Sequence, residues 1–511
     1  MKRGSITLQM SLALGLSLTL VLYSIQSVRI ADGRVLMACA LEQGLYSLFA
    51  GYDIDLYEKY GLLFLDGGYG EADFQPGKLC REVTDAAEYI VDPAKERGTL
   101  QDKTLPGVQL SGGEITGYLL ATDNSGAAFR SQVKLLMEER IGTAGIQMLA
   151  AELTDTVEIS GQQEQFSHET DIEGALREYE AQKEAAAAQT QPTDSRTENA
   201  SFSRKLFFAQ SLADRKVVSD VESQIPEVPE DFQNPIDTVQ GMWDMGILSL
   251  AIPNPGNLSS YTLDEENLVS RRTLQRGMGM AAEDEAGAFD KLMMLEFLAE
   301  TFPCYTSQSQ EEGLKYQVEY AIGKRNSDRE NLKTVLERLL LIRGASNFLY
   351  VMTSPARSAE ANQMALLISM ALLMPPAQPL IALVLKICWA YAESILDLRV
   401  LLDGGKIPLA KSDDSWQLSL YGLGNMLTNP QQGKSTESGL DYTWYLRMLL
   451  FAESQEELTD AAMDLTEHNI QARCGRPDFR LDSCVYAAEI CLTGETDMGQ
   501  IQITRSYGYD M

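Results

Sequence analysis

The sequence predicts a predominantly α-helical α+β protein with an N-terminal transmembrane helix, and three observations lead to this fold class. The segment from Gly4 to Val28 carries no charge and is long enough to cross a bilayer, since about 20 apolar residues span the hydrocarbon core. Apolar residues recur at helical spacing over most of the remaining chain, which is typical of amphipathic helices. Only short segments show alternating polarity or glycine-rich turns, so we expect small β-sheets.

The charges that flank the apolar segment predict its orientation. Lys2 and Arg3 precede it and favour a cytoplasmic N-terminus, which would place the bulk of the chain outside the cell. Arg29 and Arg34 follow the segment and weaken this asymmetry. We therefore expect a single-pass protein of the cell membrane with an extracellular main part.

A cleaved secretory signal is the alternative interpretation of this segment. Its basic start and leucine-rich middle fit a signal peptide. The stretch from Ser24 to Ser27, however, offers no small-x-small cleavage site, because Ile25 and Gln26 stand where small residues are needed. The sequence therefore favours a retained anchor.

The overall charge limits the classes of partner that the protein can bind. The chain has 511 residues, enough for several domains, and its net charge is −31, from 73 acidic and 42 basic residues. Such a surface repels nucleic acids and anionic lipid headgroups. We expect no nucleic-acid partner.

Few residues have the chemistry of catalytic or metal sites. Only two histidines occur, His168 and His468, so the common His-dependent catalytic and zinc motifs are excluded. Seven cysteines contain no C-x-x-C pair; Cys474 and Cys484 could form a disulfide or remain buried thiols. The sequence therefore predicts no catalytic, cofactor-binding or metal-binding residue.

The chain divides into four predicted regions. Residues 1–28 form the anchor, 29–188 a membrane-proximal α+β domain, 189–233 a polar linker rich in Thr, Ser and Gln, and 234–511 a mainly helical domain with small β elements. Helices are expected over 28–60, 126–155, 175–188, 239–250, 327–340, 441–452 and 456–470. Strands are expected over 62–65, 316–320, 484–491 and 501–509, with a hairpin over 108–121 around Ser111-Gly112-Gly113.

The most apolar internal region is 364–392, which a proline-rich break interrupts at 375–379. Each half is too short to span a membrane and has the length of a buried core helix. We favour core helices over a re-entrant membrane hairpin.

The extreme N-terminus resembles the start of type IV pilins and of the minor pilin-like proteins of Tad-type pilus systems. In those families a peptidase cuts after a glycine that follows basic residues, which corresponds here to the bond between Gly4 and Ser5. An acidic residue usually follows five positions after that glycine, and this chain has Gln9 there. A neutral amide lacks the charge-assisted hydrogen bond of an acid. The resemblance implies a long pilin-like helix that runs from the membrane into the external domain.

A second resemblance extends over nearly the whole chain and rests on eight segments, 49–52, 60–66, 234–236, 314–320, 327–332, 389–394, 402–408 and 439–446. Together they resemble an uncharacterised family of bacterial membrane-anchored proteins that is associated with Tad-type pilus assembly. The resemblance implies an outward-facing accessory or scaffold protein that contacts pilus or secretion-system proteins through its N-terminal helix. Small residues such as Ser11 and Gly15 would permit close helix approach there.

Two other functional classes remain open. The first is an extracellular hydrolase that uses paired carboxylates, for which Asp403, Asp413 and Asp414 near Trp416 are the candidates. The second is a polytopic membrane protein, which would require residues 364–392 to insert into the bilayer.

Overall fold

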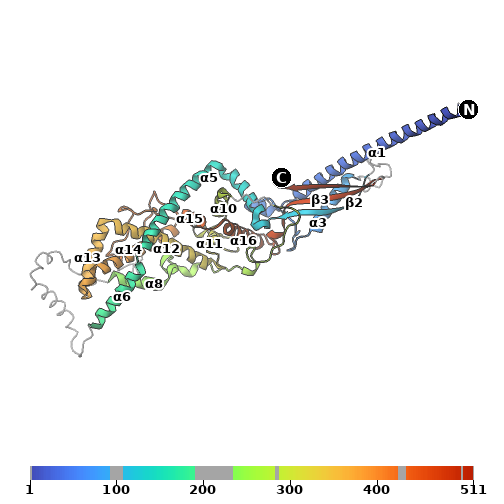
Figure 1. Cartoon of the computed structure of the whole chain (residues 1–511). Helices are drawn as coiled ribbons and strands as arrows, with labels where there is room; N and C mark the ends of the chain where they lie inside the picture. Colours follow the sequence, from blue (N-terminus) through green and yellow to red (C-terminus); the bar gives the residue numbers. More distant parts are fainter. Residues whose placement is uncertain are drawn as a thin grey trace, which may run out of the picture.

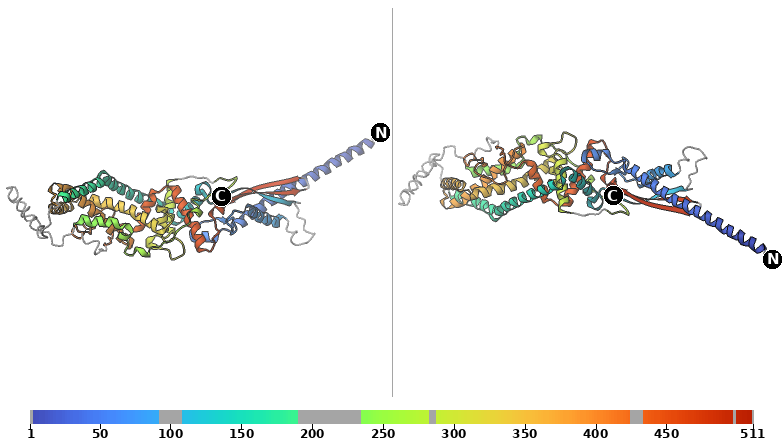
Figure 2. Two further views of the ribbon diagram at one scale, coloured as in Figure 1. Left: turned by 90° about the horizontal axis from the view of Figure 1, so that it is seen from below. Right: turned by 90° about the horizontal axis from the view of Figure 1, so that it is seen from above.

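The computed structural model describes residues 3–91, 108–189, 234–281, 287–423, 433–496 and 499–509. The molecule is elongated: helix α1 (Arg3–Phe49) projects from one end, a small sheet follows, and a body of helices forms the other end (Figure 1). Views from below and from above, each turned by 90° from Figure 1, show the same order along the long axis (Figure 2). The predominantly helical α+β class is therefore confirmed.

The sheet is antiparallel and combines segments from both ends of the chain. Its strands are β1 (Leu65–Asp66), β2 (Gln109–Leu120), β3 (Cys484–Thr496) and β4 (Gly499–Gly508). The long strand β3 is central: β2 pairs along one side of it, and β1 and β4 pair along the other. The two predicted C-terminal strands are confirmed. Strand β3 pairs with β1 and β2 of the predicted membrane-proximal region, and β4 pairs with β3. The domain bounds themselves stay a prediction.

The predicted hairpin over 108–121 is wrong, because this segment is the single strand β2. Its glycines mark irregularities in the pairing with β3, where the register shifts between Leu110 and Gly112 and again between Ile115 and Gly117. Gly113 also allows a close approach of helix α3 (Pro76–Val91), since an added Cβ would lie 2.4 Å from Oγ1 of Thr84. The glycines of β2 therefore permit bulges and close packing and do not form a turn.

The second half of α1 packs against this sheet and against α3. Its buried side chains recur at helical spacing and include Met37, Leu41, Leu45 and Phe49. They share one apolar cluster with Leu492 of β3 and with neighbouring residues of α3 and β4. The helix ends at Phe49 and the chain restarts as α2 (Ile54–Tyr60), which the Asp53 side chain caps.

The helical body contains most of the remaining elements. Its longer helices are α5 (Asp123–Glu169), α6 (Ile172–Gln189), α8 (Pro235–Met245), α10 (Ala288–Thr301), α12 (Asp328–Thr353), α13 (Pro355–Ala371), α14 (Gln378–Leu402), α15 (Tyr442–Ala452) and α16 (Gln455–Arg473). Shorter helices are α9 (Ile247–Ala251) and α11 (Gln317–Gly323), and 3-10 turns occur at Pro255–Asn257, Glu265–Asn267, Tyr305–Ser307, Pro375–Ala377 and Leu481–Ser483.

Helix α14 lies at the centre of this body and contacts α12, α13, α6 and α8. Two described helices are long and apolar enough to cross a membrane, α1 and the segment that contains α14. In the second of these, 72% of the most apolar stretch is buried inside the protein. This burial agrees with a core helix, as the sequence predicts for residues 364–392.

The predicted strand at 316–320 is wrong, because α11 covers most of this segment. Alternation of polar and apolar residues suggested a half-exposed strand. Instead, Gln317 and Glu319 are as buried as Val318 and Tyr320. Their polar groups bond inside the protein, with Gln317 to Asn469 and Glu319 to the hydroxyl of Tyr442. The alternation of polar and apolar residues in this segment therefore does not correspond to an alternation of exposed and buried side chains.

The predicted linker over 189–233 lies almost wholly outside the described residues. Cys474 and Cys484 are both free thiols in the structure.

The contrast between the two halves of α1 yields a stability prediction. Leu41 is fully buried and Leu20 is 70% exposed. Leu41→Ala should lower the free energy of unfolding by about 2–5 kcal/mol, because a buried cavity replaces the side chain. Leu20→Ala should change it by less than about 0.5 kcal/mol. Urea unfolding in detergent, followed by tryptophan fluorescence, measures both, and equal effects would contradict the packing of α1.

Candidate functional site

The first half of α1 is an exposed apolar surface. From Leu8 to Val28 its residues are exposed, and Leu12 and Leu16 each keep 63% of their accessible surface. Three hydroxyl groups in this stretch donate to carbonyl oxygens of the preceding turn, Ser11 to Leu8, Thr19 to Leu16 and Ser24 to Leu20, at 2.8–3.0 Å. Internally bonded polar groups are what a lipid environment requires. The helix is therefore compatible with a membrane anchor or a signal sequence.

The three residues of the pilin-like motif all lie in this half of α1. Gly4 and Ser5 belong to its first turns, and Gln9 is exposed one turn further along. Cleavage between Gly4 and Ser5 stays a prediction, as does a role for Gln9.

The second half of α1 runs beside β4 in the same direction. Neighbouring positions along the two elements advance together. A Cβ added at Gly33 would lie 3.8 Å from Ile501, Glu42 pairs with Arg505, Tyr46 packs against Tyr507, and Phe49 packs against Tyr509, which directly follows β4. Sixteen helical residues rise about 24 Å, and eight strand residues rise about 26 Å. The two elements therefore cover nearly the same distance side by side. The sheet thereby fixes the direction in which the apolar half of α1 projects.

An ion cluster fixes the end of α1 to the rest of the protein. Arg476, which follows α16, contacts three carboxylates: Asp53 at 2.6 Å, Asp66 at 2.8 Å and Asp55 at 3.1 Å. Asp53 lies between α1 and α2, and Asp66 belongs to β1. These partners hold the pKa of the guanidinium above its usual value although its partial burial acts against this. The cluster thus joins the sheet to the helical body.

The three carboxylates predicted for a hydrolase do not form an enclosed site. Asp403, Asp413 and Asp414 are all exposed. Asp413 accepts a hydrogen bond from the hydroxyl of Tyr350. None of the three belongs to the lining of the cavity described below, or to the lining of two smaller cavities, one of which lies beside α1. Trp416, by contrast, is buried against Trp389.

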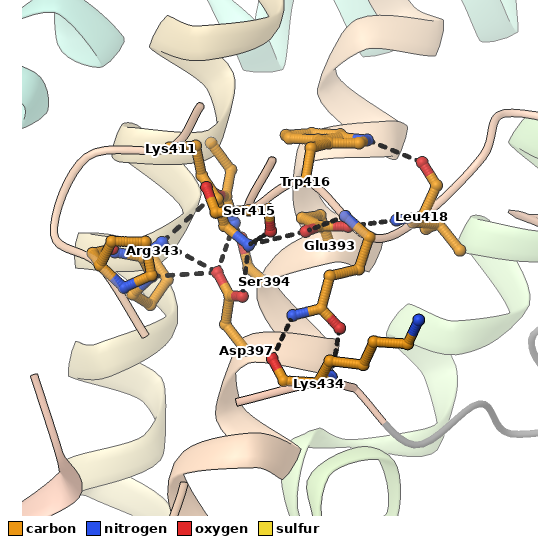
Figure 3. A network of polar contacts seen from close by, with 12 residues as sticks. Arg343, Glu393, Ser394, Asp397, Lys411, Ser415, Trp416, Leu418 and Lys434 are labelled. Atoms are coloured by element: carbon orange, nitrogen blue, oxygen red, sulfur yellow. Dashed lines mark hydrogen bonds and ion pairs between the residues drawn. The ribbon is translucent and has the colours of Figure 1, made fainter. Parts of the chain in front are cut away.

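A buried charge network links Lys411, which precedes Asp413 by two residues, to the helices beneath it (Figure 3). Lys411 Nζ contacts carboxylate oxygens of Glu393 and Asp397, each at 2.7 Å, and Arg343 contacts Asp397 at 2.9 Å. All four charged side chains are fully buried. Burial opposes ionisation of Asp397, but Arg343 and Lys411 outweigh it and lower its pKa below the usual value. Burial raises the pKa of Glu393 although Lys411 acts against this. The network thus contains two basic and two acidic groups in direct contact.

The network attaches a loop to two helices. Arg343 comes from α12 and also donates to the carbonyl oxygens of Pro408 and Leu409. Glu393 comes from α14 and accepts from the backbone N–H groups of Gln417 and Leu418. These bonds hold residues 408–418 against the helices. We assign the network a structural role, because its charged groups are enclosed and mutually satisfied.

The network was not predicted from the sequence, although the sequence contains a pattern that indicates buried charges. Glu393 and Asp397 stand four residues apart in an otherwise strongly apolar helix. Charges at that spacing share one helix face, and buried charges need partners.

A cavity lies where the sheet meets the helical body. It has a volume of about 680 Å³, and its lining includes Asn124, Ser125, Arg276 and Asp460. Asn124 and Ser125 adopt left-handed backbone conformations with φ of 50° and 56°, which costs conformational energy in non-glycine residues. Burial, then the charges of Asp464 and Glu456, raises the pKa of Asp460 to about 6. Within the described residues, no group of three or more potential metal ligands is placed to hold a metal ion.

A second buried acid lies deeper in the helical body. Glu319 accepts hydrogen bonds from the N–H of Tyr305 and the hydroxyl of Tyr442 through one oxygen, while its other oxygen is buried without a partner. Burial raises the pKa of Glu319 to about 7. This side chain therefore changes its charge near neutral pH.

Comparison with protein families gives one match. Residues 226–496, slightly more than half of the chain, match a family of unknown function, DUF5702. This protein belongs to the DUF5702 family. The DUF5702 region includes α8 to α16 and β3, and thus the buried charge network, but α1 and β4 lie outside it. No curated protein and no solved structure matches the chain.

The charge network predicts a large difference between two lysines of one loop. Lys411→Met should lower the free energy of unfolding by about 3–5 kcal/mol, because it leaves the buried Glu393 carboxylate without its cation, while Asp397 keeps Arg343. Lys406 is exposed, and Lys406→Met should change the same quantity by less than about 0.5 kcal/mol. Chemical unfolding of both variants tests this, and a mild effect of Lys411→Met would contradict the enclosed network.

The raised pKa of Glu319 predicts a pH-dependent stability difference. The folded state keeps the Glu319 proton up to a pKa of about 7, whereas the unfolded chain releases it near the usual value of 4.5. Stability therefore falls as pH rises from about 4.5 to 7. Glu319→Gln removes this loss, so its stability relative to the native chain should increase over that range, by on the order of 3 kcal/mol.

Unfolding of both proteins at a series of pH values measures this difference, in which the contributions of other titrating groups cancel. Two parallel stability curves would show that Glu319 is not a titrating buried acid.

Proposed function

We propose that this protein is a membrane-anchored, outward-facing accessory or scaffold component of a Tad-type or type IV-like pilus or secretion system, and that it acts through protein contacts. The observation that carries this proposal is the division of α1. One half is apolar, charge-free and exposed, whereas the other half is packed into the fold.

The energetics of the exposed half support insertion. Burying one large apolar side chain contributes roughly 1.5–3 kcal/mol, and at least eight leucines, isoleucines and valines of this half lie exposed: Leu8, Leu12, Leu14, Leu16, Leu18, Leu20, Val21 and Ile25. A bilayer or the transmembrane helices of partner proteins would cover them. Lys2 and Arg3 favour the outward orientation of the body.

The mechanical link between anchor and body supports a scaffold role. A continuous helix of 47 residues joins the membrane segment to the sheet, and the Arg476 cluster joins the sheet to the helical body. The body would therefore be held at a defined orientation above the membrane. Association with a pilus system rests on the N-terminal resemblance and on the resemblance to Tad-associated proteins.

A charge placed in the middle of the exposed segment tests the anchor. Arginine at the centre of a transmembrane helix costs about 2.5–3.5 kcal/mol on insertion scales. A variant with both Leu12→Arg and Leu16→Arg should therefore move from the carbonate-resistant membrane fraction to the soluble fraction. Val35→Arg is the control, because Val35 is also exposed on α1 but lies beyond the apolar segment.

Immunoblots of fractionated cells give the result directly. Release of the native protein by carbonate, or equal membrane retention of the double arginine variant, would contradict the proposal.

A further inference from the structure

The two outer edges of the sheet differ in how they are protected. The β2 edge has three register shifts in its pairing with β3, and Tyr118 exchanges two backbone hydrogen bonds with Met278 on its outer side. Bulges and covering segments are the usual means by which proteins block edge-to-edge pairing. The β4 edge has neither of these features within the described residues.

Strand β4 pairs with β3 in an unbroken register of ten residue pairs, from Thr496 with Gly499 to Ala487 with Gly508. It contains no proline. No backbone group of the described residues outside β3 bonds to it, and one of its carbonyl oxygens, that of Thr504, accepts a hydrogen bond from the side chain of Arg505. Gln500, Gln502, Thr504 and Ser506 are exposed along it. A long, regular strand with a free row of N–H and C=O groups is a template for another strand.

We propose that the free edge of β4 is a docking site for an extended segment of a different protein, which adds to the sheet as a fifth strand. Main-chain hydrogen bonds would supply affinity, and alternating side chains would supply selectivity. This inference depends on the proposed membrane anchor in one respect: the anchor is needed to exclude a second copy of this chain as the occupant.

A second copy cannot dock antiparallel in the same membrane. Because α1 runs parallel to β4, antiparallel pairing of two β4 strands would direct the two apolar helices in opposite directions. One bilayer could not receive both.

A second copy cannot dock parallel with two-fold symmetry either. A two-fold axis along the strands would turn Ile501 of one copy to one face and Ile501 of the other copy to the opposite face. Residues side by side in a sheet point to the same face, so this pairing does not form. Symmetric pairing of two β4 strands is thus excluded, and we assign the edge to a strand of a different protein.

The side chains of β4 define the chemistry of this partner. On the face that α1 covers, Ile501, Ile503 and Tyr507 are wholly or partly buried, and they favour β-branched or aromatic neighbours. The opposite face carries uncharged polar side chains. The strand has no acidic residue, and its one arginine, Arg505, already pairs with Glu42 of α1, so an uncharged partner segment meets no repulsion there. We expect a proline-free segment with alternating apolar and polar residues.

A defined peptide tests the edge on the full-length protein in lipid nanodiscs. The probe is a fluorescein-labelled peptide with the sequence of residues 500–507, which has the required alternation and no anchor to restrict its direction. A peptide with proline at its third and fifth positions is the control. We expect saturable binding of the first peptide, measured by fluorescence anisotropy, and none of the second.

Two lysine variants of the full-length protein identify the edge. Gln502→Lys places a charge on the β4 edge and should weaken binding of the peptide at least about tenfold, since edge lysines block strand addition. Gln109→Lys makes the same change at an exposed position of β2 and should leave binding unchanged. Absence of binding, or equal effects of the two variants, would overturn the proposal.

The oligomeric state separates this inference from the proposed function. Light scattering should find single copies in nanodiscs. Dimers that Gln502→Lys dissociates would show that a second copy occupies the edge and would overturn the assignment to another protein. Failure of the chain to enter nanodiscs would contradict the anchor, and the same peptide titration in detergent would still test the edge.

Discussion

The packing of the second half of α1 against β4 and α3 is the constraint on which the rest of the structure depends. Leu41 and Phe49 are buried in this contact, and the helix and strand advance in step. This packing commits half of a 47-residue helix to the fold and leaves the other half to project. The direction of the apolar segment, the position of the sheet and the availability of the β4 edge all follow from it.

The helical body at the other end is organised by satisfied polar groups in an apolar interior. Lys411, Arg343 and their carboxylate partners fasten the loop after α14 to the helices, and the Arg476 cluster fastens the body to the sheet. Buried ion pairs add little net stability compared with apolar packing, but breaking them is costly. Such contacts keep the parts of the protein in a fixed relative orientation, which the proposed scaffold role would require.

The sequence predicted the elements whose pattern is local and failed where tertiary contacts decide. The charge-free segment before Arg29 and the helix after Ser327 were predictable from composition and periodicity alone. The strand predicted at Tyr316–Tyr320 was wrong because Gln317 and Glu319 find buried partners more than 100 residues away. The glycines of β2 suggested a turn because the facing residues of α3 and β3 could not be known. The charge network stayed hidden for the same reason, since Lys411 becomes a partner of Glu393 only through the fold.

The intact mass and N-terminal sequence of the protein recovered from native membranes test the proposed anchor and its processing most directly. We expect the mature chain to keep its apolar segment and to begin at Ser5, the site implied by the pilin-like motif. An unprocessed start at Met1 would keep the anchor and remove the link to pilin processing. A mature chain that begins near Arg29 or later would identify the segment as a cleaved signal and would contradict the membrane-anchored scaffold.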